Sequence, residues 1–207
     1  RRTGVTQGYC FDLGCGDGRI VIAAARDCGA KGVGVDIDPA RIKECSQNAR
    51  SARVTEKVSF CQGNLFEIDL SPATVVTLYL LPSVNLRLRP KLFEQLKPGT
   101  RVVSHDFDMG DWLPDEKIDG LAYSVYFWVM PANFSGVWQW RGVNGQENSL
   151  HLRQTFQNVS GTWTTADTTY DISDVNVIGT DITFKVNREM SNTGGQIEAV
   201  GKMVNGK

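Results

Sequence analysis

The stretch "FDLGCGDGRIVIAAA", residues 11–25, decides the fold that we predict for the first part of this chain. An apolar, strand-like run leads into glycines at positions 14, 16 and 18, and an alanine-rich helical run follows them. Glycine lets the backbone turn tightly and approach a ligand closely, and the first amides of a helix offer hydrogen-bond donors. The stretch therefore predicts a strand, a ligand-binding loop and a helix, in that order.

Strand and helix signals alternate after this stretch. The expected strands cover residues 8–13, 32–37, 57–63, 73–81 and 100–107, and the expected helices cover residues 18–29, 39–52 and 83–96. Such alternation is typical of βαβ units. Two further apolar runs, 121–131 and 135–142, are expected to pair as an antiparallel hairpin at the sheet edge. We therefore predict an α/β fold: a Rossmann-like, doubly wound, mostly parallel sheet with an antiparallel edge hairpin.

The composition changes in the last third of the chain. Residues 1–120 carry 16 Lys+Arg and 16 Asp+Glu, whereas residues 121–207 carry 6 and 7. Alternating strand signals separated by glycine-containing turns replace the helical period there. The polar stretch at 141–149 is typical of a linker. We expect a ligand-binding domain over residues 1–142 and a small, all-β, antiparallel C-terminal module over residues 143–207.

Charge and cysteine content limit the possible partners. The net charge is −1, so no basic excess points to nucleic acid or an anionic membrane. No apolar run reaches the roughly 18 residues of a membrane span. The five cysteines all lie in the first 61 residues, without a CxxC pair, so we expect reduced thiols and no metal site. These features predict a cytoplasmic protein, although the abrupt start leaves room for a missing targeting segment.

The spacing of the glycines separates the candidate ligands. A dinucleotide fingerprint is G-x-G-x-x-G, whereas this loop reads G-x-G-x-G. Asp17 inside the loop would repel a pyrophosphate and attract a cationic group, and Asp12 offers a second acceptor nearby. S-adenosylmethionine carries an ammonium, a carboxylate and a sulfonium but no phosphate. It therefore suits the loop better than a nicotinamide dinucleotide, and an NAD-dependent oxidoreductase and a plain tight turn are the weaker alternatives.

Polar residues at the ends of the next two strands extend this site. Asp36 follows Gly14 by 22 residues, where a carboxylate accepts hydrogen bonds from ribose hydroxyls. Ile37 is expected to lie against a purine face. After the third strand, Asn64 is expected either to read the purine amino edge or to form a turn, and Leu65 is expected to pack against the ring.

These residues resemble a known family. "FDLGCGDG", "GVGVDIDP" and "CQGNLF" look like motifs I, II and III of class I S-adenosylmethionine-dependent methyltransferases, and the resemblance covers residues 9–112. One departure is Asn64, where many members carry aspartate. The resemblance implies S-adenosyl-L-methionine as the cofactor and the following binding residues: Asp12, Gly14, Cys15, Gly16, Asp17, Gly18, Asp36, Ile37, Asn64, Leu65 and Leu80.

The segment 76–112 bears on the methyl acceptor. Its "LYLLPSVN" lacks the Asn/Asp-Pro-Pro-aromatic tetrad of adenine-N6 and glutamine methyltransferases. It resembles bacterial relatives of the mitochondrial lysine methyltransferases that modify the c-ring protein of ATP synthase and the adenine nucleotide translocase. The resemblance implies a protein lysine as the favoured acceptor, while the acidic "SHDFDMGDW" departs from the mitochondrial pattern. A small-molecule acceptor and a non-catalytic binding module stay open as alternatives, and no nucleic-acid partner is expected.

A lysine acceptor would need aromatic and acidic side chains around its amine. The amine must lose a proton, and a carboxylate or His105 is suited to accept it. Aromatic rings attract the cationic form, so Phe107 and Trp112 are expected to line the channel. Ordinary core or turn roles are the alternative for these residues. The candidate catalytic residues are Asp106, Asp108 and Tyr79.

Overall fold

The computed structural model describes residues 8–143, 145–165, 168–188 and 195–204. The chain forms two compact units, Arg1–Met130 and Pro131–Lys207, and each is described by itself. None of the helices in the described part of the chain has the length and hydrophobicity that a membrane span requires.

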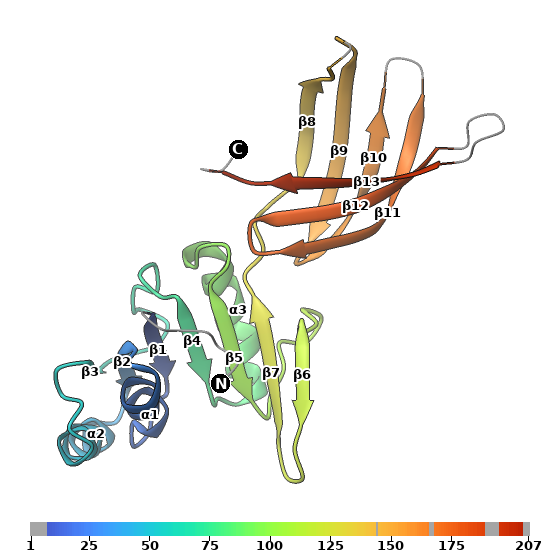
Figure 1. Cartoon of the computed structure of the whole chain (residues 1–207). Helices are drawn as coiled ribbons and strands as arrows, with labels where there is room; N and C mark the ends of the chain where they lie inside the picture. Colours follow the sequence, from blue (N-terminus) through green and yellow to red (C-terminus); the bar gives the residue numbers. More distant parts are fainter. Residues whose placement is uncertain (1–7, 144, 166–167, 189–194, 205–207) are drawn as a thin grey trace. The chain divides into compact units, whose positions relative to one another are not determined.

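The first unit is an α/β unit built on a seven-stranded sheet (Figure 1). Its elements are β1 (Tyr9–Leu13), α1 (Arg19–Cys28), β2 (Lys31–Asp36), α2 (Pro39–Ser51), β3 (Val58–Gln62), β4 (Val75–Leu78), α3 (Pro82–Gln95), β5 (Arg101–His105), β6 (Glu116–Asp119) and β7 (Ser124–Val129). The strand order is β3-β2-β1-β4-β5-β7-β6. The first five strands in this order are parallel, while β7 and β6 are antiparallel. The predicted Rossmann-like sheet is confirmed.

The sheet order places a ligand site between β1 and β4. The chain runs outward from β1 to β2 and β3, and then crosses to β4 and β5 on the other side of β1. In open α/β sheets, ligands bind at such a reversal, outside the carboxyl ends of the strands. The register aligns Leu13 with Val35 of β2 and with Leu78 of β4. The residues that follow these three positions therefore share one edge of the sheet.

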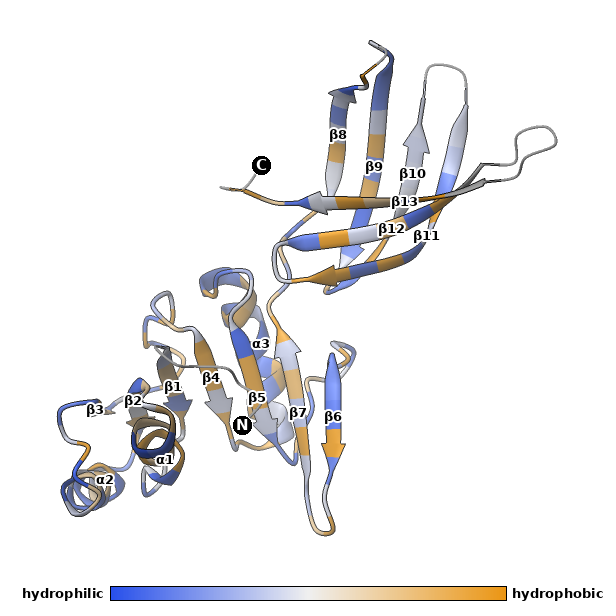
Figure 2. Ribbon diagram, viewed as in Figure 1, coloured by the Kyte–Doolittle hydropathy of each residue, from blue (hydrophilic) through white to orange (hydrophobic). Residues whose placement is uncertain are grey.

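The core of this unit explains the rigidity of that edge. The central strands read as apolar runs because helices cover a parallel sheet on both faces. Figure 2 shows this apolar character along β4, β5 and β7, in contrast to the hydrophilic residues along most of β6. The fully buried side chains of the central strands include Leu13, Val35, Val76, Leu78 and Val102.

The edge hairpin exists, but its predicted strands are wrong. The partner of β7 is β6, not the run 135–142. That run forms β8 (Gly136–Arg141) and pairs with β9 in the second unit. The charged sequence of β6, "EKID", has no apolar alternation because its residues are mostly exposed. Alternation predicts that a segment is a strand, but it does not identify the strand's partner.

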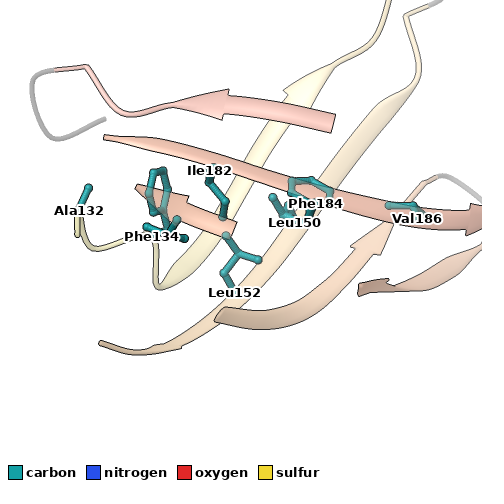
Figure 3. Close-up of a cluster of buried hydrophobic side chains, with 8 residues drawn as sticks. Ala132, Phe134, Leu150, Leu152, Ile182, Phe184 and Val186 are labelled. Atoms are coloured by element: carbon teal, nitrogen blue, oxygen red, sulfur yellow. The ribbon is translucent and has the colours of Figure 1, made fainter. Parts of the chain in front are cut away.

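The second unit is a six-stranded antiparallel sheet. Besides β8, it contains β9 (Glu147–Thr155), β10 (Asn158–Thr164), β11 (Thr169–Ile178), β12 (Asp181–Arg188) and β13 (Gly195–Lys202). Each strand pairs with its neighbours in the chain, in the order β13-β12-β11-β10-β9-β8. Figure 3 shows side chains from β9, β12 and the segment before β8 pointing toward one another. This buried cluster includes Phe134, Leu150, Leu152, Ile182 and Phe184.

Candidate functional site

The glycine loop joins the carboxyl end of β1 to the start of α1. Gly14, Gly16 and Gly18 have φ angles of 75°, 54° and 79°, in the left-handed region that favours glycine. The amides of Gly14 and Cys15 donate to the carbonyl of Val35, at 2.8 and 2.9 Å. Hydrogen bonds to β2 therefore fix the first residues of the loop, while the three glycines set its path.

The surroundings of the three glycines differ. A Cβ atom at Gly14 would lie 2.6 Å from Leu80 Cδ2, and one at Gly18 would lie 2.9 Å from the Phe60 ring. A Cβ atom at Gly16 would meet nothing within 4 Å. Gly14 and Gly18 thus allow close packing inside the unit, whereas Gly16 faces open space where a ligand can approach the backbone.

Asp36 stands at the end of β2 and contacts this loop directly. Its Oδ2 accepts a hydrogen bond from the Gly16 amide at 2.9 Å, and its Oδ1 accepts one from the Asp38 amide at 3.0 Å. A carboxylate has about four acceptor positions, so both oxygens can still accept hydroxyl donors. Asp36 therefore has the capacity to hold a ribose, as predicted. The Asp38 side chain caps α2 by accepting from the Ala40 amide.

Asp12 lies at the end of β1, under the loop, and is only 1% exposed. Its Oδ1 accepts a hydrogen bond from the Thr77 hydroxyl at 2.7 Å, while its Oδ2 is buried without a hydrogen-bond partner among the described residues. Burial raises the pKa of this carboxyl to about 6, with a further rise from the charges of Asp17 and Asp36 and an opposing effect of the Thr77 hydrogen bond. Because an unpartnered buried acceptor is costly, Oδ2 is suited to a polar group of a ligand.

The raised pKa of Asp12 predicts a pH-dependent stability. The folded protein holds this proton up to a pH of about 6, whereas the unfolded chain releases it near 3.8. Stability should therefore fall as the pH rises from about 4 to 6, by on the order of 1 kcal/mol per pH unit. Urea unfolding at a series of pH values should show this fall in the wild type and lose it in Asp12→Asn. Parallel pH profiles for the two proteins would contradict the assignment.

Two predicted loop residues have other partners in the structure. The Asp17 carboxylate accepts hydrogen bonds from Arg19 Nε at 2.9 Å and Nη2 at 2.7 Å, and this pairing lowers its pKa. Its contact with a cationic ligand group thus stays a prediction. Cys15 is buried, 3.7 Å from Cys45 between their sulfur atoms, and burial raises its pKa well above the usual range. The Cys15 side chain therefore packs beneath the loop.

The residues predicted around a purine lie beyond β2 and β3. Ile37 directly follows Asp36 and is 74% exposed, so its side chain is open to a ring. Asn64 and Leu65 follow β3, and the Gly63 amide donates to the Asp36 carbonyl, which ties the two strand ends together. The Asn64 side chain accepts from the Phe66 amide at 3.1 Å and donates to Glu67 at 2.9 Å. It forms the turn that was the alternative to purine contact.

An aromatic row continues the same edge toward β5. Because Leu78 pairs with Ser104, the residues after them, Tyr79 and His105, lie side by side. Their ring centroids are 4.4 Å apart with the rings edge-on, and His105 lies 4.8 Å from Tyr123 on its other side. Tyr79 is 57% exposed and Tyr123 is 53% exposed. We name Tyr79, His105 and Tyr123 the aromatic row.

Asp106 borders the aromatic row in a fixed position. Its φ is +64°, an unusual value for aspartate. Its amide donates to the Ser124 carbonyl at 2.8 Å, and its Oδ1 accepts from the Ser124 amide at 3.2 Å. Its Oδ2 lies 3.4 Å from His105 Nδ1, which makes no hydrogen bond within the described part of the chain. The β7 backbone thus holds this carboxylate beside the imidazole.

The rest of the loop after β5 is structural. Asn85 is fully buried and donates to the carbonyls of Phe107 and Asp108, at 3.2 and 3.3 Å. The Asp108 carboxylate is exposed and accepts from the Gly110 amide at 3.0 Å, which closes a turn. The sequence did not single out Asn85, although a lone asparagine in an otherwise leucine-rich helix was a usable signal.

The predicted place of Trp112 in a substrate channel is wrong. Its side chain is 1% exposed and packs against Phe93 and Trp128, at centroid distances of 4.6 and 5.4 Å. Its backbone carbonyl accepts from the Trp128 indole at 3.0 Å. Trp112 is a core residue because β7 places Trp128 over it, and this pairing could not be read from the sequence. The aromatic residue that does reach the row is Tyr123, which sequence reasoning missed.

The described residues form no group of three or more His, Cys, Asp or Glu side chains that could hold a metal ion. The site therefore consists of a glycine loop, two acidic residues at strand ends, an exposed isoleucine and the aromatic row with Asp106. All of them lie at the carboxyl ends of β1, β2, β4 and β5 or directly beside them.

Comparisons with known proteins agree with this arrangement. The sequence profile of the ANTKMT methyltransferase domain matches residues 12–116. A protein-lysine N-methyltransferase of Saccharolobus islandicus (strain REY15A) is 51% identical over 125 residues, which make up 58% of this chain and 78% of that protein. A lysine N-methyltransferase of Mus musculus, named for the c-ring protein of ATP synthase, is 30% identical over 156 residues, or 75% of this chain and 59% of that protein.

A solved structure is also similar. The crystal structure of an RNA methyltransferase from Salinibacter ruber in complex with S-adenosyl-L-homocysteine is 60% identical, with a TM-score of 0.61. The similarity covers 61% of this chain and 83% of that protein. The two kinds of relative therefore share one fold and carry names with different acceptors, a protein lysine and an RNA.

Proposed function

The chain belongs to the ANTKMT methyltransferase-domain family and is an S-adenosylmethionine-dependent methyltransferase, and we propose that its acceptor is a protein lysine. The single observation that carries this proposal is the aromatic row beside Asp106, at the edge that also holds the glycine loop. The names of the Saccharolobus islandicus and mouse relatives support it.

The residues of the loop fit S-adenosylmethionine. Gly16 leaves open space beside its backbone, and Asp12 Oδ2 is a buried acceptor without a partner among the described residues. We propose that the loop from Gly14 to Gly18 lies against the amino-acid part of the cofactor and that Asp36 holds its ribose. Ile37 and Leu65 would border the purine, with Leu80 below Gly14. When bound, the cofactor supplies a methyl group on a sulfonium, which a neutral amine attacks in line.

The aromatic row suits the acceptor side of the same reaction. Exposed tyrosine faces attract a lysine ammonium by cation–π contact, worth about 0.5–2 kcal/mol. The amine must be neutral to react, so a group near the row has to take its proton. Asp106 is our candidate, because the Ser124 backbone holds its carboxylate beside His105. Tyr79 would align the amine, and Asp108, two residues farther along the loop, would add negative charge.

An RNA acceptor is the second candidate function. It follows from the Salinibacter ruber relative, which carries the name of an RNA methyltransferase. The composition opposes it, since 22 Lys+Arg are balanced by 23 Asp+Glu and nucleic-acid binding relies on a basic excess. The aromatic row alone does not separate the two, because aromatic side chains also stack on bases.

Transfer of a labelled methyl group separates the candidates. The full chain, incubated with S-adenosylmethionine labelled in its methyl group and a cell lysate, should label the protein fraction, and tandem mass spectrometry should place the label on lysine Nε. The Gly16→Val variant supplies the background. Label in RNA would establish the second candidate instead, and label confined to small molecules would overturn both.

Substitution of Tyr123 tests the acceptor side alone. Tyr123→Leu removes the ring that stacks on His105 but touches no predicted cofactor contact. We expect the initial rate of lysate-protein methylation at limiting lysate to fall about 3- to 10-fold, as the loss of one cation–π contact predicts. Affinity for S-adenosylhomocysteine should not change. Leu121→Ala, a fully exposed position just before Tyr123, is the matched control and should behave as wild type. An unchanged rate in Tyr123→Leu would remove this residue from the acceptor site.

A further inference from the structure

The sheet of the second unit encloses an apolar cavity of about 450 Å³. Successive residues of a strand point to opposite faces of its sheet, so residues two apart share a face. The cavity is lined by such alternating residues from several strands. Its principal lining side chains are Trp138, Trp140, Leu150, Trp163, Ile182 and Phe184.

The cavity lies between the two edges of the sheet. β8 and β13 are the edge strands, and Trp138 of β8 and Ala199 of β13 line the same space. The sheet is therefore curled until its edges border one cavity. Protein interiors contain few voids larger than a water molecule, so this volume is no ordinary packing gap. It falls within the range of about 300–1,000 Å³ that is typical of small-molecule sites.

The walls of the cavity favour an apolar occupant. The indole nitrogen of Trp138 donates to the Phe134 carbonyl at 2.8 Å, and that of Trp163 donates to Asn148 Oδ1 at 3.1 Å. Both indoles have thus already used their only donors, and they offer ring surface to the cavity. A group that enters this space gains from burial of apolar area and finds few polar partners.

One charged residue borders the cavity among its described lining residues, and it is cationic. Lys202, near the end of β13, lies 3.3 Å from Asp181 between Nζ and Oδ1, and both side chains are more than half exposed. An exposed ion pair of this kind contributes little, so the ammonium can pair with another anion. An anionic head group beside Lys202 would leave an apolar chain free to enter the cavity.

We propose that the second unit binds a single-chain amphiphile with an anionic head group, such as a fatty-acid carboxylate. The chain occupies the cavity between β8 and β13, and the carboxylate pairs with Lys202. This site is independent of methyl transfer, since every residue that lines it belongs to the second unit.

Calorimetric titration of the full chain with dodecanoate, below its micelle concentration, tests the site. Ala199→Trp should weaken dodecanoate binding at least about tenfold, because its side chain fills the space opposite Phe184, its partner in the register. Val137→Trp adds the same ring to β8 at a 57% exposed position outside the cavity, and it should bind as wild type. No heat of binding with the wild type, or an equal loss in both variants, would overturn the proposal.

The head group and the location are tested separately. Lys202→Met should weaken dodecanoate several-fold and leave dodecanol binding unchanged, whereas equal effects on both ligands would exclude the ion pair. Wild-type protein with ¹³C-labelled dodecanoate should give nuclear Overhauser effects from the chain to the indoles of Trp138 and Trp163. Contacts to the first unit alone would overturn the site even if the variants failed to fold.

Discussion

Replacing Gly16 with valine is expected to abolish the binding of S-adenosylhomocysteine while the first unit still folds. A Cβ atom at this position meets nothing within 4 Å, so valine has room within the protein itself. The added atoms project into the space where the cofactor would approach the loop. We expect a loss of about 3 kcal/mol or more, roughly 150-fold in the dissociation constant. Isothermal titration calorimetry measures it directly.

Gly29 provides a matched control for backbone strain. It ends α1 at a φ of 71°, and a Cβ atom there also meets nothing within 4 Å. Valine at Gly16 or Gly29 should therefore lower stability by a similar amount, about 1–2 kcal/mol for a left-handed residue. Only Gly16→Val should lose the ligand. Equal binding by the two variants would show that the cofactor does not approach Gly16.

Replacing Asp36 with alanine is expected to weaken S-adenosylhomocysteine binding by about 1–3 kcal/mol, roughly 5- to 150-fold. The carboxylate would lose its charged hydrogen bonds to the ribose hydroxyls. It would also release the amides of Gly16 and Asp38, which it holds at 2.9 and 3.0 Å, so the loop becomes less ordered before binding. Both effects act in the same direction.

The isosteric variant separates these two effects. Asp36→Asn keeps one oxygen that can accept from the Gly16 amide, but it lacks the charge and half of the acceptor capacity. Its affinity should lie between those of wild type and Asp36→Ala. Asp27→Ala removes a carboxylate that is paired with Arg26 near the end of α1, and it should bind as wild type. An unchanged affinity in Asp36→Ala would contradict the ribose assignment.

The cofactor side of the site was largely predictable from the sequence. Gly16 and Asp36 lie at the ends of adjacent parallel strands, and the carboxyl ends of such strands share one edge of the sheet. Reading the strands was thus enough to bring these residues together. The pairing of Asp17 with Arg19 was not read, because a side chain two residues away competes locally for the carboxylate.

The acceptor side was less predictable because it depends on antiparallel pairing. β7 aligns Val125 with His105, and this register brings Tyr123 next to the imidazole ring. Tyr123 itself lies in the turn before β7, where no periodicity marks it. The same pairing moved Trp112 into the core and left the run 135–142 to the second unit. Register depends on both partners, and one strand's sequence does not contain it.

A crystal structure of the chain with bound S-adenosylhomocysteine tests the central claim most directly. The claim is that one sheet edge, from Ile37 through Gly16 to the aromatic row, holds both reactants. The claim predicts that the ribose hydroxyls donate to Asp36, that the ligand lies against Gly16, and that its sulfur faces Tyr79 and His105. A ligand bound without contact to Gly16 and Asp36, or with its sulfur directed away from the aromatic row, would contradict it.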